Sequence, residues 1–587
     1  MNRKLKKITH ECDFCVVGGG LAGMCAAISA ARHGLKVVII HDRPMFGGNA
    51  SSEIRMWVCG AHGDNNRETG ILEEINLENL YRNPYRTYPV WDSILFEAVK
   101  NEKNITALLN CSCLDAECED GVIKSVVGWQ LTTQSYHTVK AKLFADCSGD
   151  SILAPLTGAE HTSGREGRGV YGESFGPDET DKFTMGNSCL IQARETDGKR
   201  PFTPPEWAYK FTKEELEKRF SSLTNPLENY WYLELGGTKN TIDDAEEIRD
   251  ELLAIAYGLW DYIKNSGECN ADNWELDFVG YLPGKRENRR YIGDYVMTQQ
   301  DVEGGGKFED LVAYGGWSMD DHNPDGIRTD KPATIHYPAP SPFGIPYRSL
   351  YSKNIKNLFF AGRNISVSHS AMSATRVMAT CATMGQAVGT AAAIASRNNL
   401  SPRGVYEEKL SLLQETLIDD DCYLPTIKMK HSDMVKNAKI TSNGVGEENL
   451  TNGYDRKIGE NENCWQGKLN NTICITLEKE EFVREVRITL DSDLNRLTIG
   501  GDPRIKGKST VANYPKNEAP VSLPKTLVRD MKIEILTKNG ESKTFIIKDN
   551  RRRVIRQAVN ENCTGIRITP LTTYGSEDVR IFSLNLK

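Results

Sequence analysis

Two polar stretches of the sequence carry side chains that could move a proton. Asp321 and His322 are neighbours on a glycine-flanked loop, and His369 lies shortly before Arg376. A histidine titrates near neutral pH, so His369 is the first candidate for a general base, with Asp321 and His322 as a second acid/base pair. The alternatives are a histidine that only fixes a loop, and a capped turn at Asp321 and His322.

A cationic run provides candidates for binding negative charge. Four cations fall within the six positions from Lys285 to Arg290. Such a run is often a solvated face, but this one lies between Leu282-Pro283 and an apolar–aromatic stretch, so gripping an anion is an equally good interpretation. We expect Arg290 and Arg376 to bind substrate oxygens or an anionic cofactor.

A glycine motif near the start of the chain indicates a dinucleotide. Gly18, Gly20 and Gly23 have the spacing G-x-G-x-x-G, between an apolar run at residues 14–17 and a small-residue helix. A second apolar run, residues 36–40, follows that helix. In such a unit the first glycine permits a tight turn, the second lets the backbone approach a pyrophosphate, and the third allows close helix packing. A glycine-rich turn without a ligand is the alternative.

The residues after the second strand are placed to hold more of the dinucleotide. Such folds usually place an acid about 20 residues past the glycines to bind the ribose hydroxyls. His41 occupies that position and Asp42 follows it, so either could contact the ribose. Paired glycines after a proline then indicate backbone held close to a ligand, rather than an ordinary surface loop. The candidates in this loop are Arg43, Gly47, Gly48, Asn49, Ser51 and Ser52.

Two later strand ends are predicted to close the same site. An apolar run at residues 143–146 leads into Gly149 and Asp150, and another at residues 355–360 leads into Gly362 and Arg363. A long small-residue helix that contains Gln386 follows the second run. We expect that helix to pack on a sheet and to direct its N-terminal dipole toward the cofactor.

Composition limits the class of protein. A chain of 587 residues is too long for one core, and a net charge of −8 argues against a nucleic-acid or anionic-membrane partner. We expect no membrane span. The 15 cysteines show no metal-ligand or disulfide framework, so we expect no metal site and a reducing, cytoplasmic location. An exported protein is the alternative, if the chain lacks its signal peptide.

The expected fold class is α/β: a Rossmann-like dinucleotide-binding domain with an inserted α+β substrate domain, followed by a β-sandwich. The βαβ pattern stops near residue 166, and alternation of period two begins near residue 438, with a hairpin turn at Asn539-Gly540. Helices are predicted at residues 88–100 and 243–264, and a small β meander at 105–111, 122–128 and 136–141. The predicted boundaries are 10–165 and 342–400 for the two parts of the dinucleotide-binding domain, 166–341 for the substrate domain, 401–437 for a linker and 438–587 for the sandwich.

On these motifs, residues 10–400 resemble the FAD-dependent oxidoreductase family, with a glutathione-reductase-like FAD domain. The resemblance implies a non-covalently bound FAD and a two-domain flavoenzyme core, and it leaves the substrate open. The tail, from residues 438–443 through Trp465 to Ile473, is similar to a discoidin-type, galactose-binding-like β-sandwich. That likeness implies either glycan binding or a purely structural role.

Three functions follow from the resemblance. The first is an FAD-dependent dehydrogenase or oxidase that transfers a hydride between a small polar, sugar-like substrate and flavin N5. The second is a flavin-dependent reductase of an anionic unsaturated substrate, which the arginines would favour. The third is a non-catalytic glycan-binding protein that keeps a flavin fold. The electron acceptor is left open.

Overall fold

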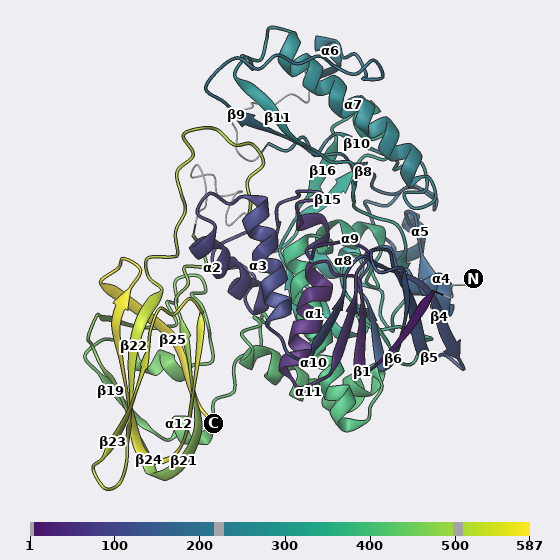
Figure 1. Cartoon of the computed structure of the whole chain (residues 1–587). Coiled ribbons are helices and arrows are strands. Elements are labelled where there is room, and N and C mark those ends of the chain that lie inside the picture. Colours follow the sequence, from purple (N-terminus) through teal and green to yellow (C-terminus); the bar gives the residue numbers. More distant parts are fainter. Residues whose placement is uncertain (1–4, 217–227, 497–508) are drawn as a thin grey trace. The chain divides into compact units, whose positions relative to one another are not determined.

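The computed structural model describes residues 5–216, 228–496 and 509–587 (Figure 1). The chain divides into two compact units. The first comprises Met1–Ala61, Tyr85–Leu413 and Lys508–Pro520, and the second comprises His62–Pro84, Gln414–Gly507 and Val521–Lys587. Each unit therefore includes a segment whose neighbours in sequence belong to the other unit.

A seven-stranded sheet of order β3-β2-β1-β6-β5-β4, with β18 paired to β6, forms the base of the first unit. Val17 is in register with both Ile40 and Asp146, and Asp146 with Phe360, so four parallel strands end at one edge. α1 connects β1 to β2, which confirms the predicted strand–turn–helix–strand unit. The parallel strands and this helix are β1 (Lys6–Val17), α1 (Leu21–Arg32), β2 (Val37–Ile40), β3 (Ile105–Leu108), β6 (Ser135–Asp146) and β18 (Leu358–Phe360).

The predicted meander was partly wrong. β3 is not part of it, because β3 pairs in parallel with β2. The meander consists of β4 (Cys111–Glu119), β5 (Val122–Gln130) and the first half of β6. β4 was not predicted because its residues are mostly polar and half-exposed, and they show little apolar alternation. β6 is one continuous strand, since β1 pairs along nearly its whole length.

Small residues bring two helices of the first unit into close contact. α10 (Met378–Asn398) packs against α1, and the two lie side by side in Figure 1. A Cβ on Gly385 would lie 2.0 Å from the Ala22 carbonyl oxygen, and one on Gly389 would lie 2.2 Å from that of Ala26. The close approach explains why this helix is rich in glycine and alanine. The short helix α9 (His369–Thr375) precedes α10, and the Ser368 hydroxyl caps it by accepting from the Ala371 N–H.

A set of smaller sheets and one long helix forms the part of the first unit that we call the cap. α7 (Ala245–Asn265) buries the predicted apolar stripe, including Ile248, Leu252 and Leu259, in the core of the cap. α3 (Tyr88–Lys100), outside the cap, has its predicted bounds. The cap strands are β8 (Asn187–Ser188), β9 (Ile191–Glu195), β10 (Glu234–Leu235), β11 (Trp274–Val279), β12 (Gly284–Lys285), β15 (Met319–His322) and β16 (Thr334–Tyr337).

The second unit is the predicted antiparallel β-sandwich. β21 (Ile473–Leu490) and β24 (Val554–Thr573) pair with each other along most of their length, through register shifts, and each also pairs with other strands toward its ends. α2 (Ile71–Arg82), from early in the sequence, buries Leu77 and Leu80 in the same core. The hairpin at Gly540 joins β22 to β23 as predicted. The other strands are β19 (Lys439–Ser442), β20 (Trp465–Lys468), β22 (Val528–Leu536), β23 (Ser542–Ile547) and β25 (Asp578–Leu586).

The remaining described elements are short connections or peripheral helices. They are η1 (Gly48–Ala50), α4 (Leu153–Thr157), β7 (His161–Thr162), α5 (Arg168–Tyr171), α6 (Lys213–Leu216), β13 (Arg290–Tyr291), α8 (Gln299–Glu303), β14 (Leu311–Gly315), η2 (Gly326–Arg328), β17 (Phe343–Pro346), η3 (Tyr347–Ser349), α11 (Pro402–Asp419), α12 (Asp433–Lys436) and η4 (Glu447–Thr451).

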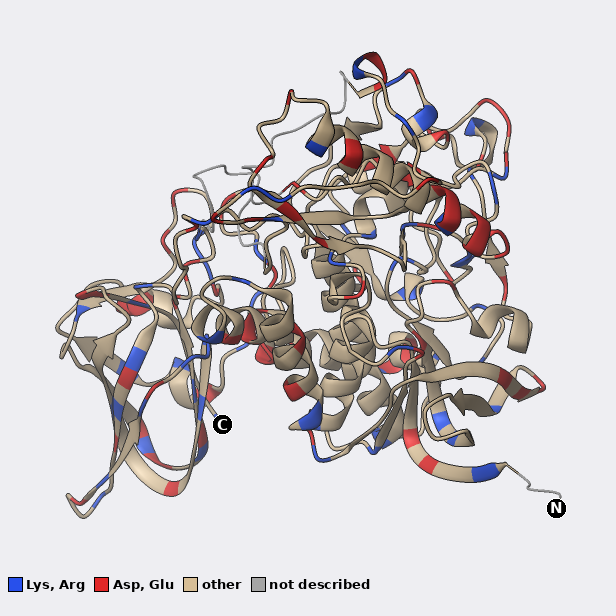
Figure 2. Ribbon diagram, turned by 45° about the horizontal axis from the view of Figure 1, so that its top comes forward, with Lys and Arg blue, Asp and Glu red and all other residues tan. Residues whose placement is uncertain are grey.

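Among the described residues, no single helix has the length and apolar composition to cross a membrane. α9 and α10 meet these criteria only when taken together, and the pair bends by 93°. Within the same ranges, no group of three or more His, Cys, Asp or Glu side chains is arranged to hold a metal ion. Figure 2 shows basic and acidic residues interspersed along the ribbon.

Candidate active site

The three motif glycines are needed for different reasons. Gly18 has φ +105°, and a Cβ there would lie 2.4 Å from the Cys147 carbonyl carbon. A Cβ on Gly23 would lie 1.9 Å from the Gly18 oxygen. By contrast, the nearest protein atom to a Cβ on Gly20 would be the Gly48 Cα, 3.9 Å away. Packing within the protein therefore requires Gly18 and Gly23 but not Gly20, which fits a backbone that must approach a ligand.

No side chain caps the N-terminus of α1, which begins after Gly20. The first-turn N–H groups and the positive end of the helix dipole therefore have no side-chain acceptor there, as a bound pyrophosphate would require. Two polar atoms nearby in sequence, Arg43 Nη1 and Glu53 Oε2, are buried without a hydrogen-bond partner among the described residues. A nucleotide could satisfy both atoms, so these residues fit an adenine dinucleotide.

His41 holds the glycine loop. Its Nδ1 accepts from the Gly19 N–H at 3.0 Å, and its Nε2 lies 3.0 Å from the Met45 carbonyl oxygen. Because Nδ1 accepts, Nε2 carries the proton and donates to Met45. Both ring nitrogens thus have partners within the protein, and Nδ1 also lies 3.2 Å from Asp42 Oδ1. The Asp42 side chain is 59% exposed, so Asp42 is the better candidate for the ribose.

The loop that contains Gly47 and Gly48 lies directly on the glycine motif. The Gly47 N–H donates to the Gly19 oxygen at 2.9 Å, and a Cβ on Gly48 would lie 3.1 Å from the Gly20 Cα. The polar side chains of the loop mainly hold the loop itself. Asn49 donates to the Lys285 oxygen at 3.0 Å, the Ser51 hydroxyl donates to the Gly48 oxygen at 2.8 Å, and the Ser52 hydroxyl contacts the Met45 sulfur.

The two predicted strand ends meet, as adjacent parallel strands must. Asp150, after β6, pairs with Arg363, after β18, at 2.6 Å, and with Lys285 at 2.7 Å. Burial alone would raise the pKa of Asp150, but the two cations hold it below its usual value. Gly149 and Gly362 both have positive φ, and a Cβ on Gly149 would strike the Arg363 guanidinium. Gln386 is buried on α10, next to Gly385.

His369 is a buried cation between two carboxylates. Its Nδ1 lies 2.9 Å from Glu287 Oε2, and its Nε2 lies 3.1 Å from Asp321 Oδ1. Burial alone would lower the pKa of His369, but Glu287 and Asp321 outweigh burial and raise it to about 10. At neutral pH the imidazole is therefore protonated, and each N–H faces a carboxylate.

Arg290 completes this network, which we call the histidine network. Its guanidinium pairs with Glu287 and, at 2.6 Å, with Glu166, and it is fully buried. Glu166 also accepts from the His369 main-chain N–H at 2.8 Å. Three carboxylates, Glu166, Glu287 and Asp321, thus face two cations, Arg290 and His369.

The alternation of strand β15 creates a second cluster on its other face. Asp321 points toward His369, whereas its neighbours Asp320 and His322 lie on the other side, as the period of a strand requires. Arg376 lies 3.1 Å from Asp320 Oδ2, and His322 Nδ1 lies 2.6 Å from Glu234 Oε2. Burial opposes ionisation of Asp320, but His322 and Arg376 hold its pKa well below the usual value.

Known proteins identify the framework around these clusters. A family model described as FAD dependent oxidoreductase matches residues 13–417. The chain belongs to the FAD-dependent oxidoreductase family. Members of this family use FAD, and the glycine loop and the unpartnered atoms of Arg43 and Glu53 fit that cofactor. The match also confirms the prediction that the protein is an oxidoreductase.

Other known proteins are similar to parts of this chain. A protein of Sinomonas cyclohexanicum named 4-oxocyclohex-2-ene-1-carboxylate 5-dehydrogenase is 41% identical over 83 residues, which are 13% of each chain. The chain thus matches a small part of that relative's length. A geranylgeranyl bacteriochlorophyll reductase-like structure from Thermoplasma acidophilum is 13% identical, covering 70% of this chain and 84% of that one, with a TM-score of 0.33. A family 32 carbohydrate-binding module from Streptococcus pneumoniae EndoD is 16% identical, covering 27% and 99%, with a TM-score of 0.20.

The structure places the five predicted catalytic residues in two groups. Asp321, His369 and Arg290 belong to the histidine network, whereas His322 and Arg376 lie in the cluster on the other face of β15. Sequence reasoning missed their carboxylate partners. Glu234 lies on a two-residue strand and Glu166 in a turn-rich stretch, and neither has a spacing that points to a site. Glu287 was also missed. Its only distinguishing feature in the sequence is that it is an acid within the cationic run from Lys285 to Arg290.

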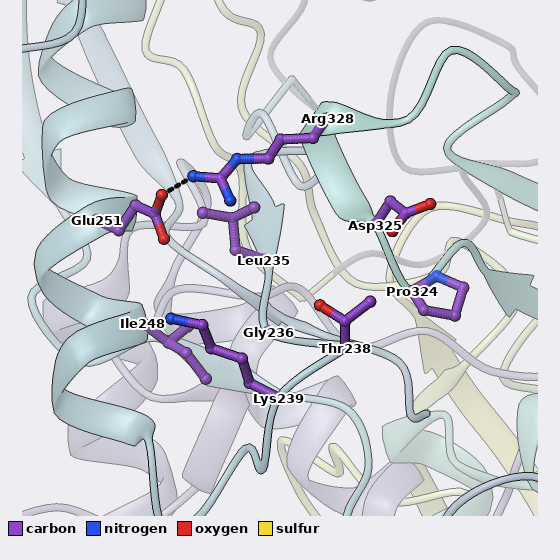
Figure 3. Close-up of a pocket in the computed structure, with 9 residues that line it drawn as sticks. All are labelled: Leu235, Gly236, Thr238, Lys239, Ile248, Glu251, Pro324, Asp325 and Arg328. Atoms are coloured by element: carbon purple, nitrogen blue, oxygen red, sulfur yellow. Dashed lines mark ion pairs between the residues drawn. The ribbon is translucent and has the colours of Figure 1, made fainter. Parts of the chain in front are cut away.

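A pocket of about 230 Å³ lies elsewhere on the cap (Figure 3). Arg328 and Glu251 form an ion pair at its edge. Lys239, Thr238 and Asp325 also line it, and none of the predicted site residues does. The position of this pocket therefore says nothing about the cofactor site.

Proposed function

We propose that this oxidoreductase dehydrogenates a small polar substrate, such as a sugar or polyol, at the histidine network. FAD, when bound, accepts a hydride at N5 of its ring system. The observation that carries the proposal is the partly exposed carboxylate of Asp321, which lies 3.1 Å from the buried His369 cation. His369 keeps this carboxylate ionised, so it can accept a hydroxyl proton from a substrate.

Asp321 is the member of the network that a substrate could reach. Its side chain is 24% exposed, against 5% for His369 and 0% for Glu287. We propose that a substrate hydroxyl donates a hydrogen bond to Asp321. As the hydride leaves the carbon, the oxygen becomes that of a protonated carbonyl, which is a strong acid. Asp321 can then take the proton even though His369, working against burial, holds its pKa below the usual value.

The pairing of the arginines favours a neutral substrate over an anionic one. Arg290 pairs with Glu166 and Glu287, and Arg376 pairs with Asp320. Binding an anion at the fully buried Arg290 would require displacing a carboxylate already in place, and Asp320 already offsets the charge of Arg376, although Arg376 Nε has no hydrogen-bond partner among the described residues. This supports the dehydrogenase over the reductase of an anionic unsaturated substrate. The Sinomonas relative is also named a dehydrogenase, although the substrate in its name is a carboxylate.

An anaerobic half-reaction tests the proposal. The FAD-loaded protein is mixed with sugars, polyols and hydroxy acids, and loss of the oxidised flavin spectrum is followed. We expect bleaching by at least one neutral polyhydroxy compound, and a rate lower by about 10²–10⁴-fold in Asp321→Asn. Asp330→Asn, an exposed acid on the same segment, is the matched control.

Two outcomes would contradict the proposal. If dithionite bleaches the flavin but no candidate alcohol does, the dehydrogenase assignment fails. If the reduced protein is instead reoxidised by unsaturated acids, the reductase is correct. Glycan binding by the sandwich stays a prediction on the sequence resemblance. A glycan array probed with the full chain tests it, and no binding would favour a structural role.

A further inference from the structure

A segment from the C-terminal part of the sequence lies within the FAD-binding unit. Residues 509–520, which we call the strap, are outside the family match of residues 13–417 but belong to the first unit. The strap begins with a buried run: Val511 is 1% exposed, and Ala512 and Asn513 are 0% exposed. A buried run of this kind is part of the core of that unit rather than a surface loop.

The strap covers the free edge of β9. The Tyr514 N–H donates to the Ala193 oxygen at 2.9 Å, and the Glu195 N–H donates to the Tyr514 oxygen at 3.0 Å. The Asn513 side-chain oxygen accepts from the Ala193 N–H at 2.9 Å. β9 pairs with β11 on its other side, so the strap satisfies backbone groups that an edge strand would otherwise leave open.

A chain of charged contacts leads from the strap toward the cofactor loop. The Arg194 guanidinium lies over the Tyr514 ring, 4.6 Å from its centre, and its Nε donates to Asp277 Oδ1 at 3.1 Å. The other oxygen of Asp277 accepts from Arg55 Nη1 at 2.9 Å. Arg55 Nη1 also donates to Gln192 on β9, at 2.9 Å. Both β9 and β11 therefore hold the Arg55 guanidinium.

Arg55 in turn fixes the loop that lies on the glycine motif. Its Nε donates to the Ser52 oxygen at 3.2 Å, and its main-chain N–H donates to the Ser51 oxygen at 2.8 Å. Arg55 has φ +67°, which a non-glycine residue adopts only when its surroundings hold it there. The same loop places Gly47 and Gly48 against Gly19 and Gly20.

We propose that the strap is a positioning element of the FAD site, with Asn513 and Tyr514 as positioning residues. By covering β9, the strap fixes Gln192, Arg194 and Asp277. These fix Arg55, and Arg55 holds the loop with Gly47 and Gly48 at the spacing from Gly20 that the dinucleotide requires. The family region 13–417 is then insufficient for full FAD affinity, because the residues that position its cofactor loop come from beyond it.

FAD titration of the full-length apoprotein tests this inference. We expect the FAD Kd to rise about tenfold in Asn513→Ala, because a buried N–H loses its acceptor. In Tyr514→Ala the rise is about threefold, through loss of the ring under Arg194, whereas Tyr514→Phe keeps the ring and the wild-type Kd. The control is Asn517→Ala, at an exposed position of the same strap.

The visible circular dichroism of the bound flavin is the second readout, since it reports the surroundings of the ring system. An altered flavin signal in Tyr514→Ala that Tyr514→Phe restores supports positioning. If Tyr514→Ala binds FAD with the wild-type Kd and signal, the inference is overturned, even if the variant is less stable. The same holds if Asn517→Ala weakens FAD binding as much as Asn513→Ala does. None of these measurements uses a substrate, so they stand or fall separately from the proposed dehydrogenation.

Discussion

The charge state of His369 can be tested through the pH dependence of stability. The pKa of His369 is about 10 in the folded protein, against about 6.5 for an exposed histidine. At about 1.4 kcal/mol per pKa unit, the pairing stabilises the fold by about 5 kcal/mol below pH 6.5. As the pH rises, His369 loses its proton in the unfolded chain before it does so in the folded protein. This stabilisation is therefore lost progressively between about pH 6.5 and 10.

Replacing His369 by glutamine removes the cation and leaves Glu287 and Asp321 facing each other. We expect His369→Gln to cost about 3–5 kcal/mol near neutral pH, because buried carboxylates lose their partner. In this variant, the free energy of unfolding should no longer show the pH dependence that His369 causes. His161→Gln, at an exposed histidine of the same unit, should behave like the wild type.

Thermal unfolding of the first unit between about pH 6.5 and 10 measures the effect on stability. Solid-state NMR of ¹⁵N-histidine-labelled protein measures the protonation directly. The His369 signal is the one among ten histidines that disappears in His369→Gln. We expect it to remain that of an imidazolium at about pH 8. A His369 signal that titrates near pH 6.5 would refute the reasoning. So would a His369→Gln variant whose stability depends on pH as that of the wild type does.

Three further predictions concern the approach of the cofactor, the packing of two helices and a buried ion pair. Gly20→Ala should fold normally but lose most FAD affinity, measured by flavin fluorescence, while Gly169→Ala, at an open position on α5, should keep it. Gly385→Ala should destabilise the first unit by about 1–3 kcal/mol in denaturant unfolding, because its Cβ would strike α1. Glu73→Gln should destabilise the second unit by about 3–5 kcal/mol in calorimetry, since buried Glu73 makes two 2.7 Å bonds to Arg496, and the flavin spectrum should not change. An unshifted unfolding transition in Gly385→Ala or in Glu73→Gln would contradict the reasoning for that variant.

Local patterns were enough to predict the framework of the first unit. The glycine spacing between two apolar runs predicts β1, α1 and β2, because the whole motif lies within one short stretch of the sequence. The apolar stripe from Ile248 to Ile263 predicts α7 for the same reason, since a 3.6-residue period is visible in the chain itself. The strand pattern of the tail likewise predicts the sandwich.

The contacts that arise only in the folded chain could not be predicted. His41 can bond both the Gly19 N–H and the Met45 carbonyl oxygen only because folding brings these two segments together. The pairing of His369 with Glu287 joins residues 82 positions apart, and neither position has a spacing that links it to the other. The sequence does not show that the strap belongs to the first unit and α2 to the second, because a local pattern does not indicate which core a segment joins.

The most direct test of the account is the FAD content of the purified full-length protein after incubation with excess cofactor. The account predicts a yellow protein that retains one FAD per chain through gel filtration, and a matched loss of that flavin in Gly20→Ala. A protein that stays colourless, or one whose Gly20→Ala variant retains FAD as tightly as the wild type, would contradict the claim that this glycine loop holds the cofactor.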